Sequence, residues 1–104
     1  MPPIYFNVEE ARNELLRLSR VYTIRHQRNT GGTIARVGGL YKFQVLGYVK
    51  VKQVLRLHKI GLEVQLSEYV PMSGFKTVQE WIANVKEWKD PMYLYHVEVM
   101  KWPR

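Results

Sequence analysis

The chain has 104 residues, 46% of them hydrophobic, with a formal net charge of +7 and a pI near 9.8. This length predicts one domain over residues 1–104, and the composition excludes a disordered chain and a membrane-spanning protein. The absence of cysteine excludes a disulfide scaffold, a cysteine nucleophile and every thiolate metal site. Because the first residues show no basic segment leading into an apolar one, no secretory signal is expected and we predict a cytoplasmic protein.

Hydrophobic spacing predicts a first helix at about residues 8–19. Apolar residues recur at intervals of three and four from Val8 to Leu18, which places them on one face of a helix. Asn7 can cap this helix, and Glu10 stands three residues further on, where a capping box requires a carboxylate.

Alternating and β-branched segments predict a series of short strands. A hairpin turn is expected at the paired glycines Gly38-Gly39, and another turn near Gly47. The segment Leu62–Leu66 is less regular and is a further candidate strand. In chain order, the other predicted strands are Arg20–Arg25, Ile34–Val37, Leu40–Leu46, Val49–Leu57 and Met92–Met100.

A second helix is predicted from Thr77, which forms a Thr-x-x-Glu capping box with Glu80, and it closes before Pro91. Trp81 and Trp88 lie on its apolar stripe and are therefore expected in the core. An order of helix, strands, helix and strand does not support a doubly wound sheet. It predicts an α+β protein, a small and strongly curved or closed β-barrel of about five or six strands with two flanking helices.

The positive charge is concentrated in the middle of the chain. Residues 15–62 contain ten basic residues and no acidic one, whereas residues 1–14 and 63–104 each carry a small net negative charge. One interpretation is general solubility; the other is a polyanionic partner, of which RNA or DNA is the commonest. Membrane phosphates are disfavoured, because no predicted helix is basic on one face and apolar on the other.

The clearest basic face is predicted on the strand Val49–Leu57. Lys50, Lys52 and Arg56 alternate with apolar residues there, and Lys42 joins them if the preceding strand pairs as a hairpin. Side chains two residues apart project together at roughly 7 Å, close to the spacing of successive phosphates along a nucleic-acid strand. Three tyrosines interleave with the basic run and can either stack on a base or pack within the sheet: Tyr22, Tyr41 and Tyr48.

Groups that carry chemistry are sparse. His26, His58 and His96 lack the spacing of metal ligands, so a structural or surface role is favoured for each of them and no metal is expected. No phosphate-binding loop or Gly-x-Ser-x-Gly pattern occurs, and no cofactor is predicted.

The stretch Leu18–Arg25, which reads Leu-Ser-Arg-Val-Tyr-Thr-Ile-Arg, resembles the Gly-x-Lys-x-x-Glu-x-Arg signature of ASCH domains. These domains are a branch of the PUA-like superfamily, and their motif often appears as Lys-Thr-x-Thr-Ile-Arg. The order of elements over residues 8–100 is similar too, with Gly74-Phe75 leading into the helix that holds Glu80-Trp81. The resemblance implies a small PUA-like β-barrel whose cleft, between the motif strand and the helices, recognises RNA or a modified nucleoside. Some relatives are amidohydrolases that remove the acetyl group of acetylcytidine with a lysine, a threonine and a glutamate.

The chain departs from this pattern at two of the three catalytic positions. Arg20 replaces the lysine, and an arginine stays protonated and cannot act as a base. The glutamate would fall near Met72–Ser73, where neither residue is acidic, so Thr23 is the one catalytic candidate left. The resemblance therefore implies binding without chemistry, with Arg20, Thr23 and Arg25 in the cleft.

We accordingly expect an ASCH-like domain that binds RNA or another single-stranded nucleic acid. Arg28 extends the cleft on the adjoining loop, while Lys42, Lys50 and Lys52 position the nucleic acid on the barrel surface. Two alternatives stay open. One is a small amidohydrolase that acts on an acylated nucleoside such as acetylcytidine through Thr23. The other is a protein-interaction module whose basic face meets an acidic partner.

Overall fold

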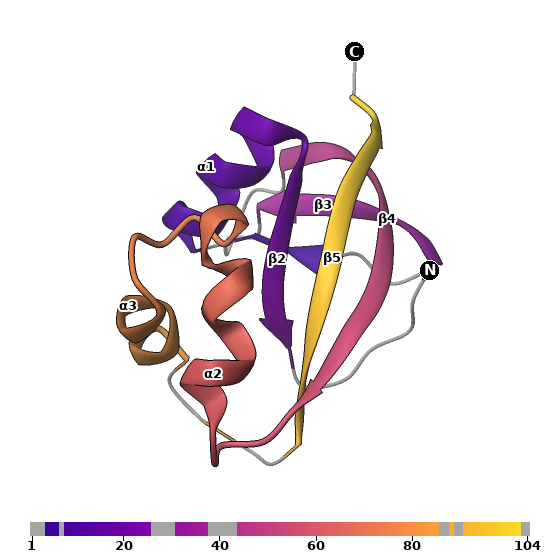
Figure 1. Ribbon diagram of the computed structural model, residues 1–104. Helices are drawn as coiled ribbons and strands as arrows, with labels where there is room; N and C mark the ends of the chain where they lie inside the picture. The colour runs from indigo at the N-terminus through magenta and orange to yellow at the C-terminus, as the bar shows by residue number, and fades with distance from the viewer. Residues whose placement is uncertain are drawn as a thin grey trace.

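The computed structural model describes residues 4–6, 8–25, 31–37, 44–85, 88 and 91–102. They fold into one curled sheet, with the helices gathered beside strand β2 (Arg20–Arg25) at its edge (Figure 1). The strands are β1 (Ile4–Tyr5), β2 (Arg20–Arg25), β3 (Gly31–Val37), β4 (Gln44–Leu57) and β5 (Met92–Lys101). The helices are α1 (Glu9–Leu18), α2 (Leu62–Leu66) and α3 (Val78–Ala83), with a 3-10 helix η1 (Ser67–Met72). Across the sheet the order is β1-β3-β4-β5-β2, antiparallel except between β1 and β3. The predicted α+β class is confirmed, and the four antiparallel strands form a half-barrel.

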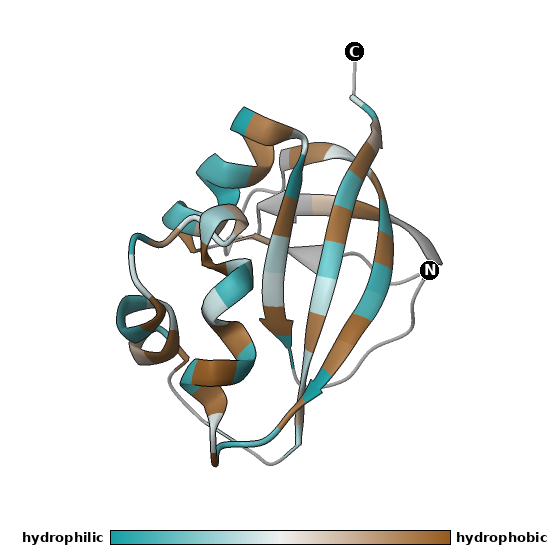
Figure 2. Cartoon of the chain, in the orientation of Figure 1, coloured by the Kyte–Doolittle hydropathy of each residue, from teal (hydrophilic) through white to brown (hydrophobic). Residues whose placement is uncertain are grey.

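Packed side chains cover both faces of the sheet. The face inside the curl, called the inner face below, carries one hydrophobic cluster, to which α1 contributes Ala11 and Leu15 and β2 contributes Val21. The opposite, outer face carries a second cluster with Tyr22 of β2 and Leu94 of β5, where α2, η1 and α3 pack. Because successive residues of a strand point to opposite faces, both clusters draw on the same strands. Figure 2 shows the resulting alternation of hydrophilic and hydrophobic residues along β4 and β5.

The first predicted helix is confirmed as α1. Val8 is its N-cap and makes no side-chain capping bond, while the expected cap, Asn7, lies outside the described residues. The helix ends at Ser19, which adopts a left-handed φ of 63° and donates its N–H to the carbonyl oxygen of Leu15. This turn delivers the chain directly into β2.

The segment Leu62–Leu66 is the helix α2, so its assignment as a strand was wrong. Leu62 and Leu66 are buried, at 5% and 0% exposure, whereas Val64 between them is 81% exposed. In a strand all three would share a face, but a period of 3.6 residues turns the middle one away. Gly61 reverses the chain ahead of this helix with a left-handed φ of 74°. The described part of the chain thus has three α-helices where two were expected.

The second predicted helix is α3, and it is shorter than expected. Its cap is confirmed, because the backbone N–H of Glu80 donates to Thr77 Oγ1 at 3.1 Å. It stops at Ala83, where the N–H of Asn84 is shared between carbonyl oxygens in a tightened last turn. Trp81 is 3% exposed and belongs to the outer cluster, as predicted. No helix in the described ranges has the length and apolarity to cross a bilayer.

β4 is one strand of 14 residues, not two strands joined by a turn near Gly47. Gly47 pairs with Ala35 of β3, and the register then slips by one residue, so that Leu46 is an extra residue in a bulge. An added Cβ on Gly47 would lie 3.2 Å from Val99 Cγ1 of β5. The glycine therefore allows close packing within the sheet. The other expected turn, Gly38-Gly39, lies outside the described residues.

A second bulge at Val54 reverses the faces along β4. The register with β5 slips by one residue there, between Gln53 and Leu55. Val51 consequently packs in the inner cluster, whereas Leu57 packs in the outer one, although an unbroken strand would keep them on one face. The predicted basic face is corrected by the same slip, because Arg56 lies on the opposite face from Lys50 and Lys52.

Gly74 joins the segment before α3 to the first turns of α1. Its φ is +90°, and an added Cβ would overlap the carbonyl oxygen of Glu10 and lie 2.6 Å from the carbonyl carbon. The backbones of these two segments therefore touch where a side chain has no room. This contact fixes α1 relative to the segment that enters α3.

Candidate functional site

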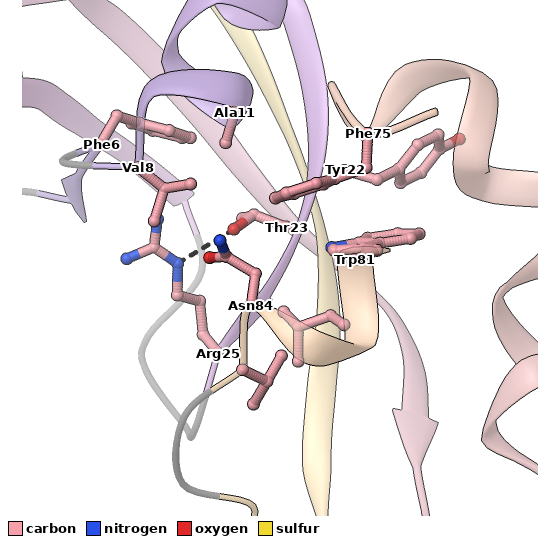
Figure 3. A pocket seen from close by; sticks show the side chains of 11 residues that line it. Phe6, Val8, Ala11, Tyr22, Thr23, Arg25, Phe75, Trp81 and Asn84 are labelled. Atoms are coloured by element: carbon pink, nitrogen blue, oxygen red, sulfur yellow. Dashed lines mark hydrogen bonds between the residues drawn. The ribbon is translucent and has the colours of Figure 1, made fainter. Parts of the chain in front are cut away.

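A pocket of about 280 Å³ lies at the edge of β2, between the start of α1 and the end of α3 (Figure 3). Its walls are largely aromatic, from Phe6, Tyr22, Phe75 and Trp81. The volume is near the lower end of the range for small-molecule sites, about 300–1,000 Å³. Among the described residues that line it, no side chain is acidic, and those with polar groups are Tyr22, Thr23, Arg25, Trp81 and Asn84.

Thr23 and Arg25, two of the residues grouped by the motif, meet in this pocket. They are two residues apart on β2 and therefore share its inner face. Arg25 Nε donates to Thr23 Oγ1 at 3.1 Å, and the guanidinium carbon lies 5.2 Å from the centroid of the Phe6 ring. These contacts fix the guanidinium on an aromatic face. Because the Thr23 oxygen accepts this bond, its hydroxyl hydrogen remains available to donate.

The backbone of β2 contributes further polar groups. β2 is the last strand of the sheet and pairs with β5 on one side. Val99 N–H donates to the carbonyl oxygen of Ser19 at 2.7 Å, and antiparallel bonding alternates, so Val21 and Thr23 also face β5. The N–H and C=O groups of Tyr22 and Ile24 therefore point away from β5, toward the pocket that both residues line.

Asn84 supplies an amide group from the wall of the pocket opposite β2. Asn84 follows α3, and in Figure 3 its side chain projects toward Thr23 and Arg25. The cap at Thr77 and the burial of Trp81 set the position of this helix. The pocket thus offers a ligand the amide of Asn84, the hydroxyl of Thr23, the guanidinium of Arg25 and a strand edge, with aromatic rings around them.

Arg20 does not join Thr23 and Arg25 in the pocket, contrary to the expectation from the motif. Arg20 is three residues before Thr23 and five before Arg25, and side chains an odd number of residues apart in a strand lie on opposite faces. It therefore lies on the outer face, where it is exposed. Arg20 and Lys50 both stand opposite Glu98 of β5, from either side, and Lys52 stands opposite His96. Arg20, Lys50 and Lys52 therefore form a group of exposed cations on the outer face.

The charges of Arg20, Lys52 and Glu98 lie close enough to His96 to affect its pKa. Burial lowers this pKa from its ordinary value, and the positive charges of Arg20 and Lys52 lower it further, while Glu98 acts in the opposite direction. The imidazole also lies against Tyr22, with ring centroids 5.1 Å apart. His96 is consequently a neutral part of the outer face at neutral pH.

Other predicted site residues do not enter the pocket. Arg28 and Lys42 lie outside the described residues. Ser73, at the position expected for a glutamate, is fully buried, and its hydroxyl donates to Val70 and accepts from the N–H of Phe75. Across the described ranges no cluster of three or more His, Asp or Glu side chains suits a metal ion.

The lining residues that the sequence analysis did not propose for the site include Phe6, Phe75 and Asn84. Phe75 had a partial indication, because it follows the glycine in the Gly74-Phe75 pair. Phe6 and Asn84 had none, since each reaches the pocket only through the packing of distant segments.

No family model, curated protein or solved structure matches this chain.

Proposed function

We propose that the chain binds single-stranded RNA and holds one base of it in the pocket beside β2. The observation that carries this proposal is the pairing of Thr23 with Arg25, 3.1 Å apart, inside an aromatic pocket at an open strand edge. A base offers a flat face and an edge of alternating donors and acceptors. RNA recognition characteristically uses both, through stacking on aromatic or guanidinium planes and hydrogen bonds to the exposed edge.

The pocket has a partner for each of these features. Trp81, Phe75 and the guanidinium of Arg25 supply flat surfaces. The outward N–H and C=O groups of Tyr22 and Ile24 can pair with the edge of a base. These groups require a single-stranded or extruded nucleotide, because stacked bases in a duplex cannot enter a pocket.

The proposal includes the finer fold assignment, an ASCH-like member of the PUA-like superfamily. It is supported by the order of helix, motif strand, antiparallel strands, helix and final strand around a curled sheet. Binding is favoured over hydrolysis of an acylated nucleoside. Thr23 has no carboxylate or lysine beside it among the described lining residues, and its oxygen already accepts a bond from Arg25.

The test measures the affinity for a fluorescein-labelled single-stranded RNA by anisotropy, with a duplex of the same sequence as competitor. We expect Thr23→Val to weaken binding about tenfold and Thr23→Ser to retain it, because serine keeps the hydroxyl that valine lacks. Asn84→Ala should also weaken binding. Gln79→Ala, on α3 but outside the pocket lining, is the matched control and should bind like the wild type.

Two results would contradict the proposal. Unchanged affinity in both Thr23→Val and Asn84→Ala would remove the pocket from RNA binding. Failure to bind any of a panel of RNAs at low salt would favour a protein-interaction module. A separate incubation with acetylcytidine tests for the hydrolase, and release of cytidine that Thr23→Ala abolishes would establish it.

A further inference from the structure

Tyr48 is an exposed aromatic residue on the outer face of the sheet. It lies on β4 two residues before Lys50, so the two side chains share a face, and it stands opposite Lys101 of β5. Its exposure is 45%, unlike Tyr22, which packs against Tyr69 and His96 further along the same face. A single exposed tyrosine is ordinary, but this one has a lysine on two sides.

Charges surround this ring in a compact arrangement, which we call the outer strip. Its residues are Tyr48, Lys50 and Lys52 of β4, Glu98 and Lys101 of β5, and Arg20 of β2, all of them exposed. Residues two apart on one face of a strand are separated by roughly 7 Å, and β2 and β4 are separated by about 10 Å across β5. Four cations therefore lie within a span of two or three nucleotides.

Glu98 is the one carboxylate of the outer strip. It stands between Arg20 and Lys50, yet no basic nitrogen in the described ranges lies within 4.0 Å of its oxygens. The cations beside it are thus not held in ion pairs with it. The outer strip keeps a net positive charge and an open surface.

The covered and open parts of the outer face are sharply divided. Below the outer strip, α2, η1 and α3 cover Tyr22, Leu94 and their neighbours in the second cluster. In the outer strip the strands face solvent. The bulge at Val54 contributes to this division, because it turns Leu57 outward under the helices and removes Arg56 from the basic face.

We infer that the outer strip is a second subsite for single-stranded nucleic acid, in which a base stacks on Tyr48 while adjacent phosphates pair with Lys52 and the other three cations of the strip. Exposed aromatic rings between cations are the arrangement that single-strand binding surfaces use, and charge complementarity selects a polyanion. The inference takes its ligand class from the proposed function but does not depend on the pocket.

The test uses a labelled oligouridylate and the anisotropy assay at several salt concentrations. Tyr48→Ala should weaken binding about tenfold to a hundredfold, the range for losing one stacked base, whereas Tyr48→Phe should bind like the wild type. Lys52→Gln should lower the slope of log affinity against log salt by about 0.7, the value for one phosphate contact on a single strand.

Arg56→Gln is the matched control for Lys52→Gln, since it removes the same charge from the same strand on the other face. It should leave both affinity and salt slope nearly unchanged. Glu98→Gln should strengthen binding several-fold, because it removes the carboxylate between Arg20 and Lys50. All four side chains are exposed, so thermal melts should show that each of the five variants folds.

The results separate this inference from the pocket. If Thr23→Val and Asn84→Ala have no effect while Tyr48→Ala and Lys52→Gln weaken binding, the pocket proposal fails and the outer strip stands. Wild-type affinity in Tyr48→Ala, or equal losses in Lys52→Gln and Arg56→Gln, would overturn the outer strip whatever the pocket variants show.

Discussion

Replacing Gly74 by alanine tests the contact that joins the two sides of the pocket. The new Cβ would lie 2.6 Å from the carbonyl carbon of Glu10, whereas ordinary contacts begin at 3.4 Å. Because the carbonyl oxygen of Glu10 would lie closer still, the backbone of α1 would have to retreat by more than about 0.8 Å, the difference between these two distances. The φ of +90° would also be strained for any residue with a Cβ.

The expected loss of stability follows from these two costs. A left-handed backbone costs an L-residue about 1–2 kcal/mol, and overpacking adds about 1–3 kcal/mol. Alanine also lowers the conformational entropy of the unfolded chain, which offsets about 0.4–1 kcal/mol of this destabilisation. Gly74→Ala should therefore lower the free energy of unfolding by about 2–4 kcal/mol, which corresponds to a fall in Tm of about 10–25 °C in a domain of this size.

Gly61→Ala is the control, because Gly61 has a similar φ of +74° but its nearest atom to an added Cβ is Gln65 Nε2 at 3.8 Å. The Gly61→Ala variant has the strained backbone angle but no steric overlap, and its free energy of unfolding should fall by about 1 kcal/mol. Urea unfolding followed by tryptophan fluorescence measures both variants. Equal losses in Gly74→Ala and Gly61→Ala would refute the role of the contact with α1.

Three further predictions concern stability. Arg17→Ala should lower the free energy of unfolding by about 1–2 kcal/mol, because it removes the 2.8 Å ion pair with Glu14, whose other oxygen is buried with no partner in the described ranges. Adding Glu14→Met should restore the stability that Arg17→Ala removes. Thr77→Ala should cost about 1 kcal/mol in chemical unfolding, since it removes the cap on Glu80 N–H, and Thr77→Ser should not. Because burial lowers the pKa of His96, its neutral form contributes stability above pH 6.5, the ordinary pKa, that is lost as pH falls. His96→Gln should flatten this part of the stability profile, and an unchanged slope would contradict the assignment.

The sequence predicts best those elements whose hydrophobic period is unbroken. β2 was placed at its observed bounds, and β5 within one residue, since β2 alternates throughout and β5 alternates up to Val99, before its register with β4 slips at Met100. Prediction failed along β4, where the extra residues Leu46 and Val54 each shift the register and exchange the faces. No local pattern marks such bulges, because they are set by the neighbouring strands.

The site divides in the same way. The motif grouped Thr23 with Arg25, and the two share a face because they are two residues apart in a strand. Arg20 was grouped with them from the motif, although a separation of three or five residues puts it on the other face. Phe6 and Asn84 reach the pocket from just after β1 and α3, whose positions depend on tertiary packing.

The central position of β5 has a consequence for how the domain opens. Leu94 and Tyr95 are consecutive and fully buried, yet they belong to the clusters on opposite faces. Neither cluster can come apart without exposing a side chain of the strand that serves both, so the two should melt as one cooperative unit. The slowest amide hydrogen exchange is therefore expected in the middle of β5, with protection set by global unfolding, and the fastest at the two-residue edge strand β1.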